Sequence, residues 1–174
     1  MMLLAGVGYS HLSDLSFGPL LVERLQEMAW PDTVQIEDFS YGPIGVLMRL
    51  EDEPVHFDRA VFAGATERDR LPGTLNIYRW EGGPDDAEQV QARIAEAVTG
   101  VIGVENLLVI MDHFGVLSAN TTVIELEPVE REWGMDMSAL GRQRLEQAVE
   151  WIRAEVDGNS ALSLNGSHST ASGA

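Results

Sequence analysis

The sequence predicts an α/β fold, a three-layer sandwich with a central, mostly parallel sheet and helices on both faces. Two observations support this fold class. Residues 2–7 and 60–65 are apolar runs without polar alternation, which is typical of strands covered on both faces. Strand-like and helix-like segments also alternate along most of the chain, as they do in open α/β sheets. We therefore expect residues 2–7, 34–38 and 60–65 to be adjacent central strands.

The other expected elements follow from periodicity and from helix start and stop signals. Leu21, Val22 and Leu25 recur at helical spacing behind Pro19, which suits a first turn, and Pro31 ends that segment. Periodicity alone does not separate helix from strand at residues 104–111, which we interpret as a helix. The expected helices are 19–29, 46–50, 84–98, 104–111 and a last one capped by Asp136 or Ser138; the further strands are 75–80 and 121–126.

The composition separates one domain from a tail. A chain of 174 residues has the length of a single domain, which we place at residues 1–157. From Gly158 onward the sequence consists mainly of Ser, Gly, Asn, Ala and Thr. We expect residues 158–174 to be a disordered tail, whose removal leaves the melting temperature unchanged.

The charge of the chain limits its partners. The chain has 28 acidic residues and 11 basic ones, all arginine, and a formal net charge of −17. A field this negative repels phosphate backbones and anionic headgroups, so we expect neither nucleic acid nor a membrane as partner. A basic protein segment, or a partner that carries a cation, suits this charge better.

Localisation is only weakly indicated. The chain has no cysteine, so it contains neither disulfides nor a thiolate metal site. We find no signal peptide and no apolar run near the ~18 residues that a membrane span requires. We therefore expect a cytoplasmic protein.

A ligand cleft is expected where the parallel strands end. In open α/β sheets, ligands bind outside the carboxyl ends of the strands. The loops at residues 8–18, 38–45 and 64–73 occupy these places, and we expect Asp14 and Asp38 near the mouth of the cleft.

The common nucleotide and nucleophile motifs are absent or incomplete. Gly6-Val-Gly8 followed by a helix invites a dinucleotide reading, with Asp38 as the ribose-binding acid. However, His11 stands where the third glycine of that motif belongs. There is neither a P-loop nor a G-x-S-x-G nucleophile elbow.

Most other polar residues have a plainer interpretation than catalysis. His11 and Asp14 could share a weak cation site, but Asp14 more readily caps its own turn. The acids Glu125, Glu127, Glu130 and Glu132 are expected to form solvated faces.

Taken together, these segments resemble the NiFe-hydrogenase maturation endopeptidases over about residues 2–156. Those enzymes remove a C-terminal peptide from the hydrogenase large subunit once nickel has been inserted. The similar motifs are Gly6-Val-Gly8-Tyr9, Asp14-Leu15 and Gly18 after the first strand, Asp38 with Gly42 and Gly45 after the second, Gly64-Ala65 and Pro72-Gly73-Thr74 around the third, and Pro128 with Gly134-Met135-Asp136 after the last.

The chain departs from this family at the residues that the resemblance makes functional. Family members sense the nickel of their substrate with an acid after the loop aspartate, an aspartate after the third strand and a histidine before a helix. Leu15, Gly64 and Gly100 stand at these positions. Leucine and glycine side chains offer no lone pair to a cation. We therefore expect no metal ligands at the family site and no cofactor of the chain's own.

The acids that still match the family are candidate catalytic residues. These are Asp14 and Asp38. A shifted loop could also bring Glu67 or Asp69 into the place of a lost ligand.

The resemblance implies a hydrogenase maturation protease-like protein that acts in the C-terminal processing or maturation of a NiFe-hydrogenase large subunit. That subunit, or a similar client protein, is the implied partner. Whether the chain is still an enzyme is left open. The alternatives are a non-catalytic chaperone or scaffold for a hydrogenase subunit, and an unrelated α/β domain that binds a small ligand. The sequence does not indicate an oligomeric state.

Overall fold

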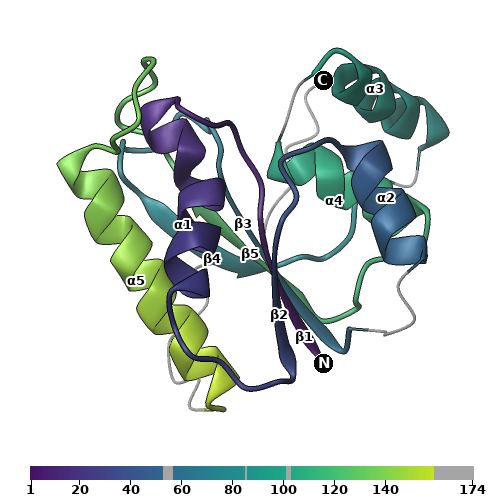
Figure 1. Ribbon diagram of the computed structural model, residues 1–174. Helices are drawn as coiled ribbons and strands as arrows, with labels where there is room; N and C mark the ends of the chain where they lie inside the picture. Colours follow the sequence, from purple (N-terminus) through teal and green to yellow (C-terminus); the bar gives the residue numbers. More distant parts are fainter. Residues whose placement is uncertain (53–56, 85, 101–102, 159–174) are drawn as a thin grey trace.

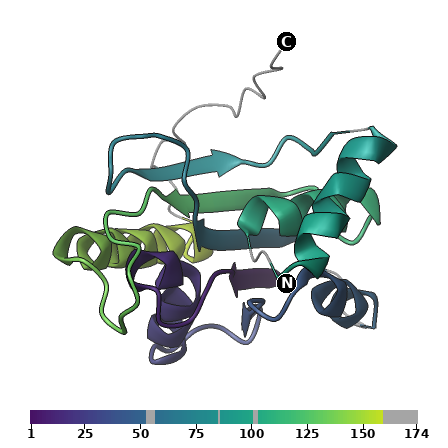
Figure 2. The same ribbon diagram turned by 90° about the horizontal axis from the view of Figure 1, so that it is seen from above.

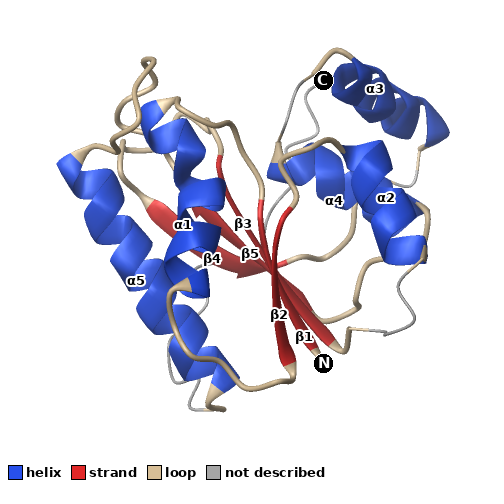
Figure 3. Ribbon diagram, in the orientation of Figure 1, coloured by secondary structure: helices blue, strands red, loops and turns tan. Residues whose placement is uncertain are grey.

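The predicted three-layer α/β architecture is confirmed by the computed structural model, which describes residues 1–52, 57–84, 86–100 and 103–158. A five-stranded sheet lies between two layers of helices (Figures 1 and 3). The strands are β1 (Met2–Gly6), β2 (Val34–Asp38), β3 (Arg59–Ala65), β4 (Leu75–Arg79) and β5 (Thr121–Leu126). The helices are the short 3-10 helix η1 (Ser13–Ser16), α1 (Phe17–Gln26), α2 (Pro43–Glu51), α3 (Ala87–Val98), α4 (Val104–His113) and α5 (Ala139–Val156).

The strand order in the sheet is β2-β1-β3-β5-β4. Strands β1, β2, β3 and β5 are parallel, whereas β4 pairs with β5 in the antiparallel direction. The expected adjacency of the first three strands is confirmed, but β2 is an edge strand rather than a central one. Its alternating sequence Val-Gln-Ile-Glu-Asp leaves it only partly buried, while every residue of β1 and β5 is buried.

Two apolar cores hold the layers together. Helices α1 and α5 cover one face of the sheet, and α2 and α4 cover the other (Figures 1 and 2). Helix α3 packs mainly on α4 and has a single buried residue, Val90. The sheet is therefore covered on both sides, which explains the continuous apolar runs in β1 and β3.

Helix boundaries differ from the sequence expectation where local geometry decides them. Helix α2 begins at Pro43, earlier than expected, because Gly42 adopts a φ of 107° that turns the chain into the helix. Of the two expected caps of α5, Ser138 is the one used. Its Oγ accepts a hydrogen bond from the Gly141 backbone N–H at 2.9 Å.

The described residues of the predicted tail end at Gly158, and residues 159–174 lie outside the described part of the chain. Within the described ranges, no helix combines the length and the hydropathy that a membrane crossing needs.

Candidate functional site

The loops expected to form the site do follow strands that end at one edge of the sheet. Four strands are parallel, so the loops after β1, β2, β3 and β5 all leave from their shared carboxyl edge. The loop after β1 contacts the loop after β2, because the Gly8 backbone N–H donates to Ser40 Oγ at 3.2 Å. The first two of the predicted loops are therefore in direct contact.

Asp14 is not at the mouth of a cleft, contrary to the expectation. Its side chain is completely buried and belongs to η1. The carboxylate accepts four hydrogen bonds, from the backbone N–H groups of Val129, Glu130 and Ser138 at 2.9, 3.1 and 2.9 Å and from Ser138 Oγ at 2.8 Å. An ionised carboxylate has about four acceptor sites. Asp14 is thus fully used in holding the segment after β5.

Asp38 remains exposed at the carboxyl end of β2. One of its oxygens, Oδ1, accepts a hydrogen bond from the Ser40 backbone N–H at 2.9 Å. This contact forms a local turn and leaves the carboxylate open to solvent. A role for Asp38 toward a substrate stays a prediction.

His11 and Asp14 do not form a cation site. His11 is exposed, with its ring centroid 6.1 Å from that of Trp133, whereas the Asp14 carboxylate is buried. Across the described residues, no group of three or more His, Cys, Asp or Glu side chains is arranged to hold a metal ion.

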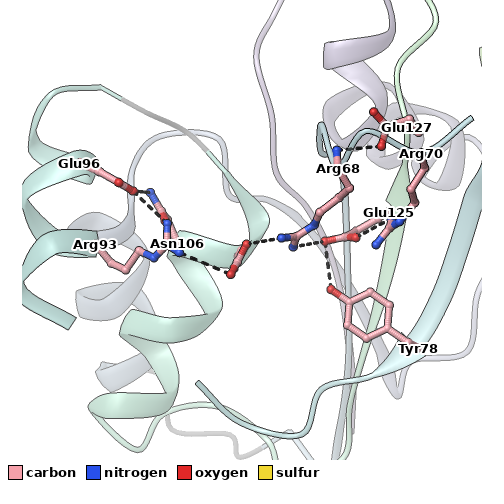
Figure 4. A network of polar contacts seen from close by, with 9 residues as sticks. Arg68, Arg70, Tyr78, Arg93, Glu96, Asn106, Glu125 and Glu127 are labelled. Atoms are coloured by element: carbon pink, nitrogen blue, oxygen red, sulfur yellow. Dashed lines mark hydrogen bonds and ion pairs between the residues drawn. The ribbon is translucent and has the colours of Figure 1, made fainter. Parts of the chain in front are cut away.

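A buried ion-pair network lies at the ends of β3 and β5, and Glu125 is its centre (Figure 4). The Glu125 side chain is fully buried. It accepts from Arg68 Nη2, Arg70 Nη1 and Tyr78 Oη, each at 3.0 Å. Neighbouring Glu127 accepts from the Arg68 backbone N–H at 2.9 Å. These contacts attach the loop after β3 to β5.

The same network continues into the helices on the α4 side of the sheet. Arg68 Nη1 lies 2.8 Å from Oε2 of Glu105, which is in the first turn of α4. Arg93 of α3 lies 3.6 Å from the other oxygen of Glu105 and donates to Asn106 Oδ1 at 3.2 Å. Arg68 therefore connects the sheet to the N-terminal end of α4.

The contacts of this network shift the pKa values of three of its groups, Glu125, Tyr78 and Arg68. Burial disfavours ionisation of Glu125, but the hydrogen bond and positive charge of Arg68 outweigh it and lower the pKa of Glu125. Burial and the Glu125 carboxylate raise the pKa of Tyr78. Burial opposes the charge of Arg68, yet Glu125 and Glu105 raise the pKa of Arg68. Glu125 and Arg68 are therefore charged at neutral pH, and Tyr78 keeps its proton.

The network corrects two expectations about acidic residues. Glu125 and Glu127 were expected on solvated faces, but both are buried, and only Glu130 and Glu132 of that group are exposed. The signal was present in the sequence, because a glutamate inside a strand covered on both faces must be buried and paired.

The loop after β3 has two acids, Glu67 and Asp69, and a role for either of them as a metal ligand stays a prediction. Glu67 is half exposed and pairs with Arg131 at 3.3 Å, and Asp69 is exposed. The alternating arginines of this loop, Arg68 and Arg70, point inward to Glu125 instead.

A cavity of about 310 Å³ lies at the opposite, amino edge of the sheet. Leu3 of β1, Ala60 and Phe62 of β3, and residues 115–118 after α4 contribute to its wall. The cavity lies at the other edge of the sheet from the loops expected to form the cleft, and neither Asp14 nor Asp38 lines it.

No protein-family model and no curated protein matches this chain. Solved structures do match it. A hydrogenase 2 maturation peptidase from Thaumarchaeota archaeon SCGC_AB-539-E09 is 28% identical, with a TM-score of 0.63 over 91% of this chain and 98% of that one. The chain is thus similar in fold to the hydrogenase maturation peptidases.

Two further solved structures have a similar fold at lower identity. The hydrogenase maturating endopeptidase HybD from E. coli is 23% identical, with a TM-score of 0.68 over 90% of this chain and 92% of that one. The [NiFe] hydrogenase maturation protease HycI from Thermococcus kodakarensis KOD1 is 20% identical, with a TM-score of 0.57 over 91% and 92%. The similarity extends over almost the whole of each chain.

The three positions compared with the family's ligands now have defined surroundings. Leu15 lies in η1 and is partly buried. Gly64 has no room for a side chain, because a Cβ there would lie 2.8 Å from the Val7 carbonyl oxygen and 3.3 Å from Val104 Cβ. Gly100 follows α3 with a φ of 88°, a conformation that favours glycine.

Proposed function

We propose that this chain takes part in the maturation of a NiFe-hydrogenase large subunit and that it does so by binding the subunit without cleaving it. The structural similarity supports the maturation role, since the solved structures that match this chain are hydrogenase maturation peptidases. The chain keeps the strands and loops of that fold, so a binding surface can persist where the chemistry has changed.

The surroundings of Gly64 carry the non-catalytic part of the proposal. A metal ion requires three or four oxygen or nitrogen donors that converge on one point. Position 64 offers none, and Val7 and Val104 leave no space for a larger residue there. The nearest acid on the adjacent strand, Glu125, is held by two arginines. Nickel in the substrate would therefore find no ligand set at this edge.

Asp38 is the exposed acid that remains from the family pattern. In the proposed role it contacts a basic or polar group of the client and takes no part in peptide hydrolysis. A single carboxylate with a hydrogen bond to its own turn lacks the second group that would activate a water or bind a metal.

The decisive experiment compares cleavage and binding with the same client. The chain is mixed with the nickel-loaded precursor of a large subunit, and both the precursor length and complex formation are measured by mass spectrometry and gel filtration. We expect a stable complex and an uncleaved precursor. An active maturation protease with its own precursor serves as the control that the assay detects cleavage. Removal of the C-terminal peptide would contradict the non-catalytic role.

Calorimetric titration with nickel, zinc and cadmium tests the metal site independently of the client. We expect no submicromolar binding to the chain alone. Tight binding that is lost on Asp38→Ala substitution would show that a metal site has been rebuilt around this residue.

A further inference from the structure

Two loops at the carboxyl edge form one continuous platform, which we define as residues 11–14 and 129–137. Their backbones are hydrogen-bonded to each other: the Ser13 N–H donates to the Gly134 carbonyl at 3.1 Å, and the Gly134 N–H donates to the His11 carbonyl at 3.0 Å. Figure 1 shows the second of these loops projecting past the start of α1. The platform thus combines two segments that are far apart in the sequence.

The backbone conformation of the platform is held by the buried Asp14 carboxylate. His11 and Ser13 adopt φ values of 62° and 45°, which are unfavourable for residues with a side chain. Such a conformation persists where the surrounding structure enforces it. The enforcing group is Asp14, whose four accepted hydrogen bonds all come from residues 129–138.

This rigid platform presents large apolar side chains to solvent. The exposed fractions are 80% for Trp133 and 74% for Met135. The neighbouring turn after β3 adds Leu71, which is 80% exposed. A tryptophan on a preordered backbone binds a partner without the entropy cost of ordering a loop, and it is the residue type most enriched among binding hot spots.

The surroundings of these apolar side chains are acidic. Glu130, Glu132 and Asp136 of the platform are all exposed, and its single basic residue, Arg131, is paired with Glu67. An exposed apolar group within a negative rim fits a partner that combines an apolar side chain with positive charges.

A groove continues from the platform along the helices. It has a volume of about 440 Å³, begins at Met135 and runs between α1 and α5. The acids on its wall, Glu23, Glu27, Asp136 and Glu146, outnumber its arginines, and Arg24 is already paired with Glu146 at 3.0 Å. The groove thus extends the negative surface in one direction.

We propose that the platform and this groove dock a basic, extended segment of the client protein, with Trp133 as the apolar anchor. The proposal rests on the proposed function, because it assigns the place at which the client is held. A second copy of this chain is a poor occupant, since it would bring a net charge of −17 to an acidic surface.

The test compares full-length variants for binding to the hydrogenase large subunit by calorimetry. Trp133→Ala removes the anchor, and Phe114→Ala removes an exposed aromatic side chain that follows α4, at the opposite edge of the sheet. We expect Trp133→Ala to weaken binding by about 30-fold or more and Phe114→Ala by no more than about twofold. The affinity of the wild-type protein for the subunit should also fall as the salt concentration is raised. Equal affinities of wild type and Trp133→Ala would overturn the inference while leaving the proposed function intact.

A synthetic peptide separates this inference from the proposed function. The probe is a short peptide of alternating arginine and leucine, with a glutamate and leucine peptide as its control. Binding of the basic peptide that depends on Trp133, together with no binding of the large subunit, would support the surface and contradict the client. If neither the basic peptide nor the large subunit binds, both the inference and the proposed function are overturned. A photo-crosslinker at position 135, beside the anchor, should label an arginine- or lysine-rich segment of the subunit. Labelling of an acidic segment or of a second copy would contradict the inference.

Discussion

Gly64 and Glu125 are register partners in the adjacent parallel strands β3 and β5. Paired residues in a sheet point to the same face, so the Glu125 carboxylate extends on the side where a side chain at position 64 would lie. Position 64 is closed by Val7 and Val104, and Glu125 is held by Arg68 and Arg70. This part of the sheet therefore contains an acid whose charge is already neutralised by arginines.

The closed space at Gly64 predicts a large effect of one methyl group. Gly64→Ala places a Cβ 2.8 Å from a backbone oxygen, which requires the strand or α4 to move. We expect a loss of at least about 2 kcal/mol in the free energy of unfolding, measured in urea. Gly103→Ala is the control, because a Cβ there has no atom within 4 Å. Its cost should stay below about 1 kcal/mol. A tolerated Gly64→Ala would show that the position can still accept a side chain.

Arg68 should contribute more to stability than other ion-paired arginines. Arg68→Ala leaves the buried Glu125 with one arginine partner and removes the link to Glu105. We expect a cost of about 3 kcal/mol in chemical unfolding, as for other broken buried ion pairs. The exposed pair of Arg131 and Glu67 provides the comparison, and Arg131→Ala should cost less than about 1 kcal/mol. Similar costs for both variants would mean that the network contributes little.

The lowered pKa of Glu125 predicts acid sensitivity with a definite sign. The folded state keeps Glu125 ionised at a pH where the unfolded chain already binds a proton. The stabilisation is therefore complete above the ordinary glutamate pKa of about 4.3, and it is lost as the pH falls through the lower pKa of the folded state. Unfolding curves between pH 3 and pH 7 should show a smaller loss of stability on acidification for Glu125→Gln than for wild type. Parallel pH profiles would contradict this assignment.

Loss of the Asp14 carboxylate should lower the stability of the protein and also loosen residues 129–137 of the platform. Asp14→Ala leaves the N–H groups of Val129, Glu130 and Ser138 without their acceptor. We expect a loss of about 3 kcal/mol and faster proteolysis within residues 129–137, detected by limited digestion and mass spectrometry. Asp38→Ala is the matched control and should change neither quantity measurably, since Asp38 is exposed. Unchanged digestion of Asp14→Ala would show that the loop is held by other contacts.

The sequence predicts the fold well where apolar periodicity is strong. The two-sided burial of β1 and β3 and the helical spacing of α5 follow directly from their residues. The edge position of β2 was missed, although its alternating polar residues indicated a strand with an open side. Strand order depends on contacts between distant segments, and no local pattern records it.

The candidate site was harder to predict, because its main contacts join residues far apart in the chain. Arg68 and Glu125 are 57 positions apart, and no spacing rule connects them. The carboxyl ends of the strands indicated which loops could form a cleft, and this placement predicted Asp14 near its mouth. The structure buries Asp14 instead, since only the folded chain brings the N–H groups of residues 129, 130 and 138 to it.

The bonds of Asp14 also set an order of events during synthesis. They join residues that lie 115 to 124 positions apart in the sequence. Translation releases the amino-terminal segments first, so Asp14 leaves the ribosome long before its partners do. The strained loop around His11 and Ser13 cannot be held in place during that interval. A chain whose synthesis has not passed Ser138 accordingly lacks the ordered Trp133 surface, and a client that recognises this surface does not bind it.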